Sequence, residues 1–252
     1  MIRRADFSPR GACTCYSSRS LFRRESARAF APRLALSPQP SHSEIVKVQT
    51  RFIISAADPQ QFPAPSAPEI AFLGRSNVGK SSLINSLVGS KVAKTSNTPG
   101  RTQTINFFDL RRPGKPHAEL TFVDLPGYGY ARAPKELSTQ WARFIDPYLT
   151  SRPSLTLCLS LVDVSVPPQQ LDIQLHDWLR HHDRPFLVIA TKADRISNNQ
   201  LRKSLASLSQ ELGVAPSAII PFSSKSRTGH AALWSAILEA VGIRPIADQP
   251  AE

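Results

Sequence analysis

From Glu69 onward, short apolar runs alternate along the chain with longer segments in which apolar residues recur at helical spacing. The apolar runs predict strands at 69–73, 104–110, 119–124, 155–163, 186–191 and 218–222. The periodic segments predict helices at 79–89, 135–149, 168–181, 197–212 and 229–241. Strands that are apolar throughout and separated by helices are typical of a mostly parallel sheet covered on both faces. The pattern therefore predicts an α/β fold.

One pair of predicted strands departs from this alternation. Between 104–110 and 119–124 lies only RRPGKPHA, which is too short for a crossover helix. We therefore expect these two strands to form an antiparallel hairpin at one edge of a six-stranded, otherwise parallel sheet with helices on both faces.

The first part of the chain differs in composition from the rest. Residues 1–40 contain eight arginines, no lysine and only Asp6 and Glu25 as acids, and so carry half of the formal net charge of +12. Such a segment is typical of an organelle transit peptide. Its arginines favour the mitochondrial matrix over the chloroplast stroma, and a basic arm that contacts RNA or membrane is the alternative.

The domain boundaries follow from this composition. Residues 1–44 are expected to be transit peptide and linker, 45–243 the folded domain and 244–252 a C-terminal tail. No stretch approaches the roughly 20 apolar residues of a membrane span, so we expect no membrane insertion. The three cysteines indicate neither a disulfide framework nor a zinc site, and Cys158 lies in an apolar run where a buried thiol is expected.

Residues 74–81 read GRSNVGKS and match the pattern GxxxxGK[ST] in full, directly after a predicted strand and at the start of a predicted helix. The glycines let backbone N–H groups turn inward around phosphates, and the helix N-terminus adds partial positive charge. In this motif Lys80 would bridge the β- and γ-phosphates of a nucleotide, and the Ser81 hydroxyl would bind Mg²⁺. The sequence therefore predicts a nucleotide phosphate site.

A second motif, DLPG at 124–127, ends the third predicted strand. An aspartate at this place can reach the Mg²⁺ ion through a water, and the Gly127 N–H can contact the γ-phosphate. The motif is common by itself, but its position at a strand end downstream of residues 74–81 favours the same site.

Two further motifs follow later strands, TKAD at 191–194 and SSK at 223–225. The Asp194 carboxylate can accept hydrogen bonds from N1–H and the exocyclic amine of guanine, whereas adenine offers neither donor there. Leaving a carboxylate unpaired against adenine is costly, so the sequence favours GTP over ATP. The stem of Lys192 would lie along the base, and residues 223–225 would present backbone N–H groups to the guanine O6.

Five stretches of the chain together resemble the EngB (YihA) GTPases of the TrmE-Era-EngA-EngB-septin-like class: GRSNVGKSSLIN, TPGRTQTINFF, DLPGYGYA, TKAD and FSSKS. The resemblance covers about residues 45–243, with an organellar, mitochondrial member indicated by the leader. It implies a six-stranded Ras-like fold, Mg²⁺-dependent GTP hydrolysis to GDP and phosphate, and a role in large ribosomal subunit assembly. We accordingly expect a monomer whose partners are GTP or GDP, ribosomal RNA and the large ribosomal subunit.

The resemblance also implies which residues form the site. It assigns GTP contacts to Gly74, Arg75, Ser76, Asn77, Val78, Gly79, Lys80, Ser81, Gly100, Arg101, Thr102, Gln103, Thr104, Asp124, Leu125, Pro126, Gly127, Thr191, Lys192, Ala193, Asp194, Phe222, Ser223 and Ser224. It assigns catalytic roles to Lys80, Asn77, Thr102 and Gly127. It assigns Mg²⁺ ligation to Ser81 and Thr102. Thr98 and Thr104 are alternatives to Thr102, because all three hydroxyls lie in the same segment.

The residue after Gly127 is unusual for a hydrolase of this kind. Ras-type enzymes orient the attacking water with a glutamine there, whereas this chain has Tyr128, so slow intrinsic turnover is expected. Related GTPases with an asparagine inside the phosphate loop use it to hold K⁺, and Asn77 matches that asparagine. We therefore expect K⁺, held by Asn77 and the 94–104 loop, to stabilise the charge that develops on the phosphoryl group. The alternative for Asn77 is that it only supports the loop backbone. Tyr128 and Tyr130 either stack on RNA bases or protein, or pack against the helix that follows them.

Three classes of function fit these motifs to different degrees. The leading interpretation is an organellar GTPase that acts in large ribosomal subunit assembly. A GTP-gated anchoring protein in organelle division, with little turnover, is the alternative, and a P-loop kinase is disfavoured by TKAD. Several basic residues of the domain suit a phosphate-rich partner such as ribosomal RNA: Arg111, Arg112, Lys115, Arg132, Lys135, Arg202 and Lys203.

Overall fold

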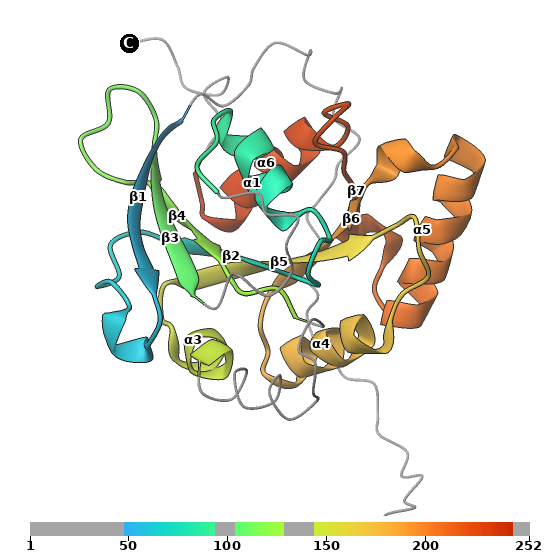
Figure 1. Cartoon of the computed structure of the whole chain (residues 1–252), viewed down its shortest axis with the longest axis horizontal. Helices are drawn as coiled ribbons and strands as arrows, with labels where there is room; N and C mark the ends of the chain where they lie inside the picture. The colour runs from blue at the N-terminus through green and yellow to red at the C-terminus, as the bar shows by residue number, and fades with distance from the viewer. Residues whose placement is uncertain (1–47, 94–103, 129–143, 244–252) are drawn as a thin grey trace, which may run out of the picture.

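The computed structural model of the chain describes residues 48–93, 104–128 and 144–243 (Figure 1). Within these residues, seven strands form one sheet in the order β1-β3-β4-β2-β5-β6-β7. The strands are β1 (Gln49–Ala56), β2 (Glu69–Gly74), β3 (Ile105–Arg111), β4 (Leu120–Asp124), β5 (Leu155–Asp163), β6 (Phe186–Thr191) and β7 (Ile219–Pro221). From β4 to β7 all neighbours in the sheet are parallel, and β3 runs antiparallel to both of its neighbours.

The predicted α/β class and the antiparallel hairpin are confirmed, with Asn106 of β3 paired to Asp124 of β4. The antiparallel edge is also confirmed, but the prediction of six strands is wrong, because β1 pairs with β3 and extends the edge beyond the hairpin. The register of β1 shifts between Phe52 and Ile54, as at a bulge, and the strand is half exposed. A bulge interrupts the two-residue alternation on which a strand prediction depends.

Five α-helices lie among the described residues: α1 (Lys80–Val88), α3 (Asp146–Ser151), α4 (Gln170–His181), α5 (Asn198–Leu212) and α6 (His230–Ala240). Figure 1 shows α1 and α6 on one face of the sheet and α3 and α4 on the other, with α5 beside β6. Short 3₁₀ turns occur at Pro59–Gln61, Ala193–Arg195 and Pro216–Ala218. Four helix predictions agree within two residues, and of the fifth, 135–149, the part before residue 144 lies outside the described residues.

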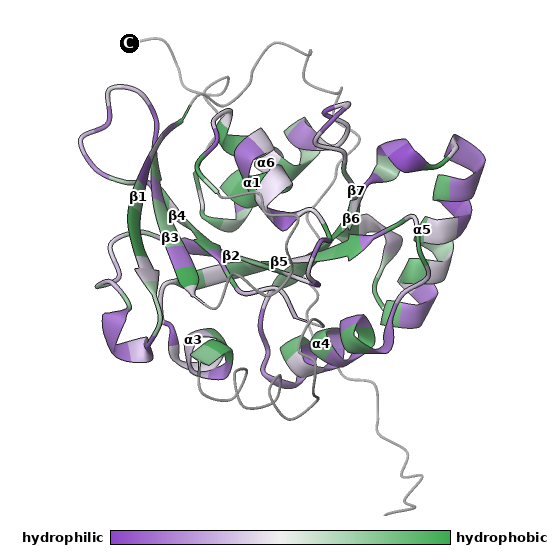
Figure 2. Ribbon diagram, in the orientation of Figure 1, coloured by the Kyte–Doolittle hydropathy of each residue, from purple (hydrophilic) through white to green (hydrophobic). Residues whose placement is uncertain are grey.

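The core lies between the sheet and the helices on each face. Strands β2, β4 and β6 are buried along their whole length, and Figure 2 shows apolar residues along the central strands. Cys158 of β5 is fully buried, and burial raises the pKa of its thiol to about 12, so it packs as a small apolar group. Among the described residues, no helix combines the length and apolar content that crossing a membrane requires.

Two helices begin with side-chain caps. In α4, the Gln169 N–H donates to the Asp172 carboxylate at 3.0 Å, and the Gln169 side chain accepts in return from the backbone of Asp172. In α5, the Ser197 hydroxyl accepts from the Gln200 N–H at 3.3 Å. Such caps satisfy N–H groups that have no partner inside the helix. They set where α4 and α5 start relative to the strands that precede them.

Candidate functional site

The phosphate loop, residues 74–81, joins the end of β2 to the first turn of α1. Gly79 has φ +105°, a left-handed conformation that side chains rarely adopt, so glycine is required there. Asn77 has φ +64°, which asparagine tolerates better than most residues, and its side chain is exposed. The predicted loop therefore forms between strand and helix, with the conformation that its glycine and asparagine permit.

The loop is fixed by bonds to neighbouring strand ends. The Thr191 hydroxyl at the end of β6 donates to the Val78 carbonyl oxygen at 2.8 Å and to the Val162 carbonyl oxygen of β5 at 3.2 Å. The Ser76 N–H donates to the Tyr128 carbonyl oxygen at 2.9 Å. The loop is thus held from one side by TKAD and from the other by the residue that follows DLPG.

Lys80 and Asp124 meet in the structure. The Lys80 ammonium group donates to the Asp124 carboxylate, and both side chains are buried. The sequence assigned Lys80 to the phosphates and Asp124 to Mg²⁺, and the structure brings the two assigned groups to one place at the mouth of the loop. Because the charges neutralise each other here, a bound nucleotide with its metal would have to take over both partners.

The residues present fit a magnesium ion of the kind that nucleotides carry. Ser81, half buried in the first turn of α1, and Asp124 both offer oxygen donors. Mg²⁺ prefers oxygen and keeps waters and phosphate oxygens, so one or two protein ligands suffice. In the described part of the chain, no group of three His, Cys, Asp or Glu side chains forms an all-protein metal site. The predicted ligand Thr102 lies outside the described residues, as do Gly100, Arg101, Gln103 and the alternative Thr98.

Gly127 lies directly against the phosphate loop. A Cβ at this position would stand 3.0 Å from both the backbone nitrogen and the hydroxyl oxygen of Ser76, so only glycine fits without displacement. The Ser76 hydroxyl also lies 3.4 Å from the Gly127 carbonyl oxygen, to which it donates. DLPG is therefore in contact with the loop that it was predicted to serve.

Tyr128 does not occupy the place of a water-positioning glutamine. Its side chain is buried, and its hydroxyl donates to Asp172 of α4 at 2.8 Å. Burial first, and then the Asp172 carboxylate, raise the pKa of the Tyr128 phenol well above its usual value. The helix that Tyr128 bonds to is α4 and not the predicted helix that directly follows it in the sequence. Tyr130 and most of that following segment lie outside the described residues.

The residues predicted to read the base also lie together. The Ser223 hydroxyl donates to the Asp194 carboxylate at 2.6 Å, and this bond lowers the pKa of Asp194. The Ala193 N–H donates to the Phe222 carbonyl oxygen at 3.2 Å, which ties the two segments at the backbone. Asp194 is exposed while Ser223 is buried, so the carboxylate is held in one orientation and open to a ligand.

Sequence reasoning missed Asp163, the last residue of β5. The Lys192 ammonium group donates to its carboxylate at 2.5 Å, and the Ser165 N–H and hydroxyl donate at 3.0 and 2.5 Å. Burial of the carboxyl, the largest influence, raises its pKa, but the bonds from Lys192 and Ser165 outweigh it and the pKa is lowered. The only signal in the sequence was an acidic residue at the end of a buried strand, and this signal does not indicate which residues the carboxylate would bond to.

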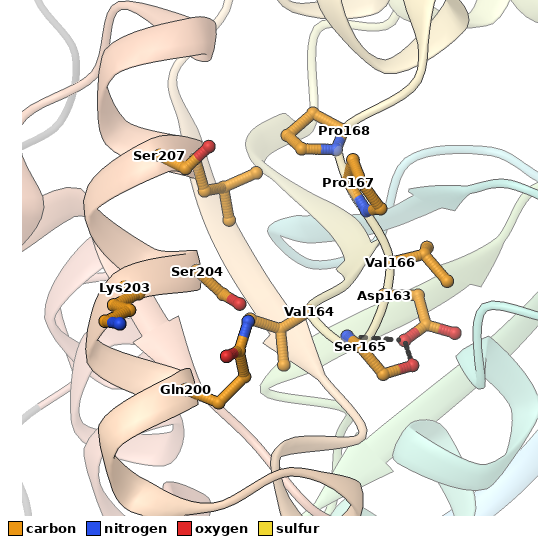
Figure 3. A pocket seen from close by; sticks show the side chains of 11 residues that line it. Asp163, Val164, Ser165, Val166, Pro167, Pro168, Gln200, Lys203, Ser204 and Ser207 are labelled. Atoms are coloured by element: carbon orange, nitrogen blue, oxygen red, sulfur yellow. Dashed lines mark hydrogen bonds between the residues drawn. The ribbon is translucent and has the colours of Figure 1, made fainter.

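A cavity of about 240 Å³ opens beside Asp163 (Figure 3). The segment 163–168 lines one side, and α5 lines the other with Gln200, Lys203, Ser204, Ser207 and Leu208. The Asp163 carboxylate turns toward Ser165, as the dashed lines in Figure 3 show. The cavity therefore adjoins the base-reading residues without including Asp194 or the phosphate loop.

The part of the chain that contains the phosphate loop and DLPG matches a known protein family. A family model described as "50S ribosome-binding GTPase" matches residues 69–192. The probable GTP-binding protein EngB of Koribacter versatilis is 65% identical over 78% of this chain and 96% of its own length. The chain belongs to the EngB family of GTP-binding proteins. The EngB protein of Acidobacterium capsulatum is 51% identical over 76% of this chain and 90% of its own length.

A solved EngB structure supports the fold. The crystal structure of a probable GTP-binding protein EngB is 26% identical, covers 70% of this chain and all of that chain, and has a TM-score of 0.56. The EngB relatives named above come from bacteria and give no support to a mitochondrial location. The predicted transit peptide lies outside the described residues, and the location stays a prediction.

Proposed function

We propose that this EngB-family GTPase acts as an assembly factor for the large ribosomal subunit and that the GTP site described above controls its binding there. The observation that carries the nucleotide assignment is the joint placement of Asp194, held by Ser223, and the phosphate loop, held by Thr191. A base-reading carboxylate after β6 and a phosphate cradle after β2, at the carboxyl ends of two parallel strands on either side of β5, match a guanine nucleotide. The matched family description, a 50S ribosome-binding GTPase, supports the ribosomal role.

We assign each site residue a role that follows from its chemistry. We assign the terminal phosphates to Lys80 and the loop backbone, and the γ-phosphate also to the Gly127 N–H. Ser81 and Thr102 would hold Mg²⁺, with Asp124 acting through a water. Bound Mg²⁺ would neutralise charge on the phosphate oxygens. Asp194 reads the guanine edge, and Lys192, steadied by Asp163, lies along the base.

Turnover requires a group other than Tyr128, because the phenol is buried and bonded to Asp172. We propose that Asn77, exposed in the phosphate loop, helps to hold K⁺ there. Bound K⁺ would place a fixed positive charge against the phosphoryl group. GTP hydrolysis by the wild type is expected to be faster in K⁺ than in Na⁺, and Asn77→Ala should remove that difference. Equal rates in both salts would contradict the proposal.

Co-sedimentation tests the ribosomal role. The tagged chain is expressed in cells of its source, and the cells are lysed with a non-hydrolysable GTP analogue or with GDP. The ribosomal particles are then separated by sedimentation. We expect retention on large-subunit particles with the analogue and release with GDP. Asp194→Asn, which is expected to lose guanine nucleotide, should not be retained. Absence of the wild type from all particles in both nucleotides would contradict the role and favour a GTP-gated anchoring protein instead.

A further inference from the structure

Tyr128 is joined to the phosphate loop through its backbone. Its N–H donates to the Gly74 carbonyl oxygen at 3.2 Å, and its own carbonyl oxygen accepts from the Ser76 N–H at 2.9 Å. These two bonds continue the parallel pairing of β2 and β4 by one bridge, between Arg75 and Tyr128. A shift of the Tyr128 backbone therefore moves Gly127 relative to the loop.

The side chain of Tyr128 is joined to α4. Its hydroxyl donates to one oxygen of the Asp172 carboxylate. The second oxygen of that carboxylate accepts from the Gln169 N–H and so caps the start of α4. Tyr128 is 7% exposed and Asp172 2%, so the bond is shielded from water. A buried hydrogen bond to a carboxylate is among the stronger kinds, and its loss leaves a carboxylate oxygen unpaired. One carboxylate thus sets both the start of α4 and the place of residue 128.

Arg75 of the phosphate loop supplies charge to the same place. Burial raises the pKa of both Asp172 and Tyr128, and the positive charge of Arg75 partly opposes this by lowering both pKa values. The Arg75 Nε is buried and makes no hydrogen bond with the described residues. The negative charge of Asp172 is therefore offset from the loop side by a residue that belongs to the nucleotide site.

We propose that Asp172 is a positioning residue for the GTPase reaction: through Tyr128, it holds the Gly127 N–H where the γ-phosphate binds. Gly127 is in contact with Ser76 and cannot change its distance from the loop without moving the Tyr128 backbone. Because GDP lacks the γ-phosphate, the Tyr128–Asp172 bond favours GTP selectively. The inference rests on the assignment of Gly127 proposed above and does not depend on the ribosomal role.

The chain offers a matched control for this bond. The Tyr148 hydroxyl of α3 donates to the Glu69 carboxylate at 2.9 Å, and both residues are buried. Glu69 begins β2 and Gly74 ends it, so this second phenol–carboxylate bond lies at the opposite end of the strand from the phosphate loop. Tyr128→Phe and Tyr148→Phe each delete one hydroxyl of the same chemical kind.

Binding of GDP and of a non-hydrolysable GTP analogue, each with Mg²⁺, tests the inference. Tyr128→Phe should raise Kd for the analogue by about tenfold and leave Kd for GDP nearly unchanged, as expected when one hydrogen bond is lost from a state that only GTP uses. Tyr148→Phe should lower the unfolding temperature about as much as Tyr128→Phe does. It should leave the ratio of the two Kd values at its wild-type value. In addition, kcat/KM for GTP should fall in Tyr128→Phe and stay near the wild-type value in Tyr148→Phe.

A second variant covers the case in which Tyr128→Phe folds poorly. Asp172→Asn retains an oxygen that can accept from Tyr128 but lacks the negative charge, and should give a smaller change in the Kd ratio. Equal weakening of both nucleotides by Tyr128→Phe, or the same change of ratio in Tyr148→Phe, would overturn the positioning role. A wild type that binds neither nucleotide would instead overturn the GTP site itself.

Discussion

Thr191 shows how one side chain can serve both fold and site. Its hydroxyl donates to the carbonyl oxygens of Val78, in the phosphate loop, and Val162, in β5. Thr191 and Val78 lie more than a hundred positions apart in the sequence, so no local sequence pattern predicts the bond between them. The first residue of TKAD therefore fixes the phosphate loop, while the last residue of the motif, Asp194, is exposed and predicted to contact the base.

Thr191→Val is expected to weaken GDP and a GTP analogue by the same factor, about tenfold, since the whole loop loses a support and not one phosphate contact. Titration of each nucleotide measures the two affinities. Thr121→Val is the matched control, because its hydroxyl donates at 2.8 Å to Asp109 within the sheet. The interpretation is wrong if Thr121→Val weakens the nucleotides as much as Thr191→Val does.

At the scale of elements, a buried ion pair joins the start of β2 to the segment that follows α3. The Arg152 guanidinium donates through Nε and a terminal nitrogen to Glu69, and through that terminal nitrogen to the Pro63 carbonyl oxygen at 2.8 Å. Arg152 is 9% exposed and Glu69 2%. The pair ties the segment around Pro63, the end of α3 and the central sheet together at the end of β2 away from the site.

Arg152→Met leaves Glu69 buried without its cation, so the free energy of unfolding should fall by about 3–5 kcal/mol. Urea unfolding measures the change. The exposed pair of Asp177 and Arg180 in α4 is the comparison, and Asp177→Asn should cost below about 1 kcal/mol. Similar losses in both variants would mean that burial of the Glu69–Arg152 pair does not set its contribution.

Helix α4 also contains a buried imidazole. His176 is fully buried, its Nδ1 donates to the Asp172 carbonyl oxygen at 2.6 Å, and burial lowers its pKa from 6.5 to about 4. The nearby charges of Asp177 and Arg180 oppose each other in their effect on this pKa. The ring is therefore neutral in the folded protein at pH values where it is protonated in the unfolded chain.

A lowered histidine pKa means that the unfolded state binds the extra proton, so stability falls as pH drops below 6.5 and levels off near pH 4. The full loss from His176 is about 3 kcal/mol. Unfolding measured between pH 7 and pH 4 should show a shallower decline for His176→Gln than for the wild type. The exposed His181→Gln should follow the wild type, and a His176→Gln curve parallel to the wild type would contradict the account.

In the whole molecule, the ends of the strands bring together motifs that lie far apart in the sequence. The phosphate loop, DLPG, TKAD and residues 222–224 could be predicted because each is a short motif after an apolar run, and parallel strands end at one edge of the sheet. Asp163 and Asp172 could not, because a single acid carries no sign of its partner across the fold. Strand β1 was missed for a different reason, its bulge and half-exposed pattern.

Two of the basic residues that suit a phosphate-rich partner have partners within the domain. Arg112 donates to Glu119, and this bond raises the pKa of Arg112 and lowers that of Glu119. Arg111 donates to Gln49 at 3.0 Å. Arg202 and Lys203 are exposed on α5, and Arg132 and Lys135 lie outside the described residues. A phosphate-rich partner would therefore meet α5 more readily than it would meet Arg112.

The base specificity conferred by Asp194 decides whether these strand ends form a guanine-nucleotide site. Binding of GDP, ADP and xanthosine diphosphate is compared between the wild type, Asp194→Asn and the exposed control Asp183→Asn. The wild type and the control should prefer GDP over both other nucleotides, because the carboxylate accepts from the N1–H and amine of guanine. Asp194→Asn should prefer xanthosine diphosphate, since its amide can donate to the C2 oxygen of xanthine. Equal binding of GDP and ADP by the wild type, or a retained GDP preference in Asp194→Asn, would contradict a guanine-nucleotide site built on these strand ends.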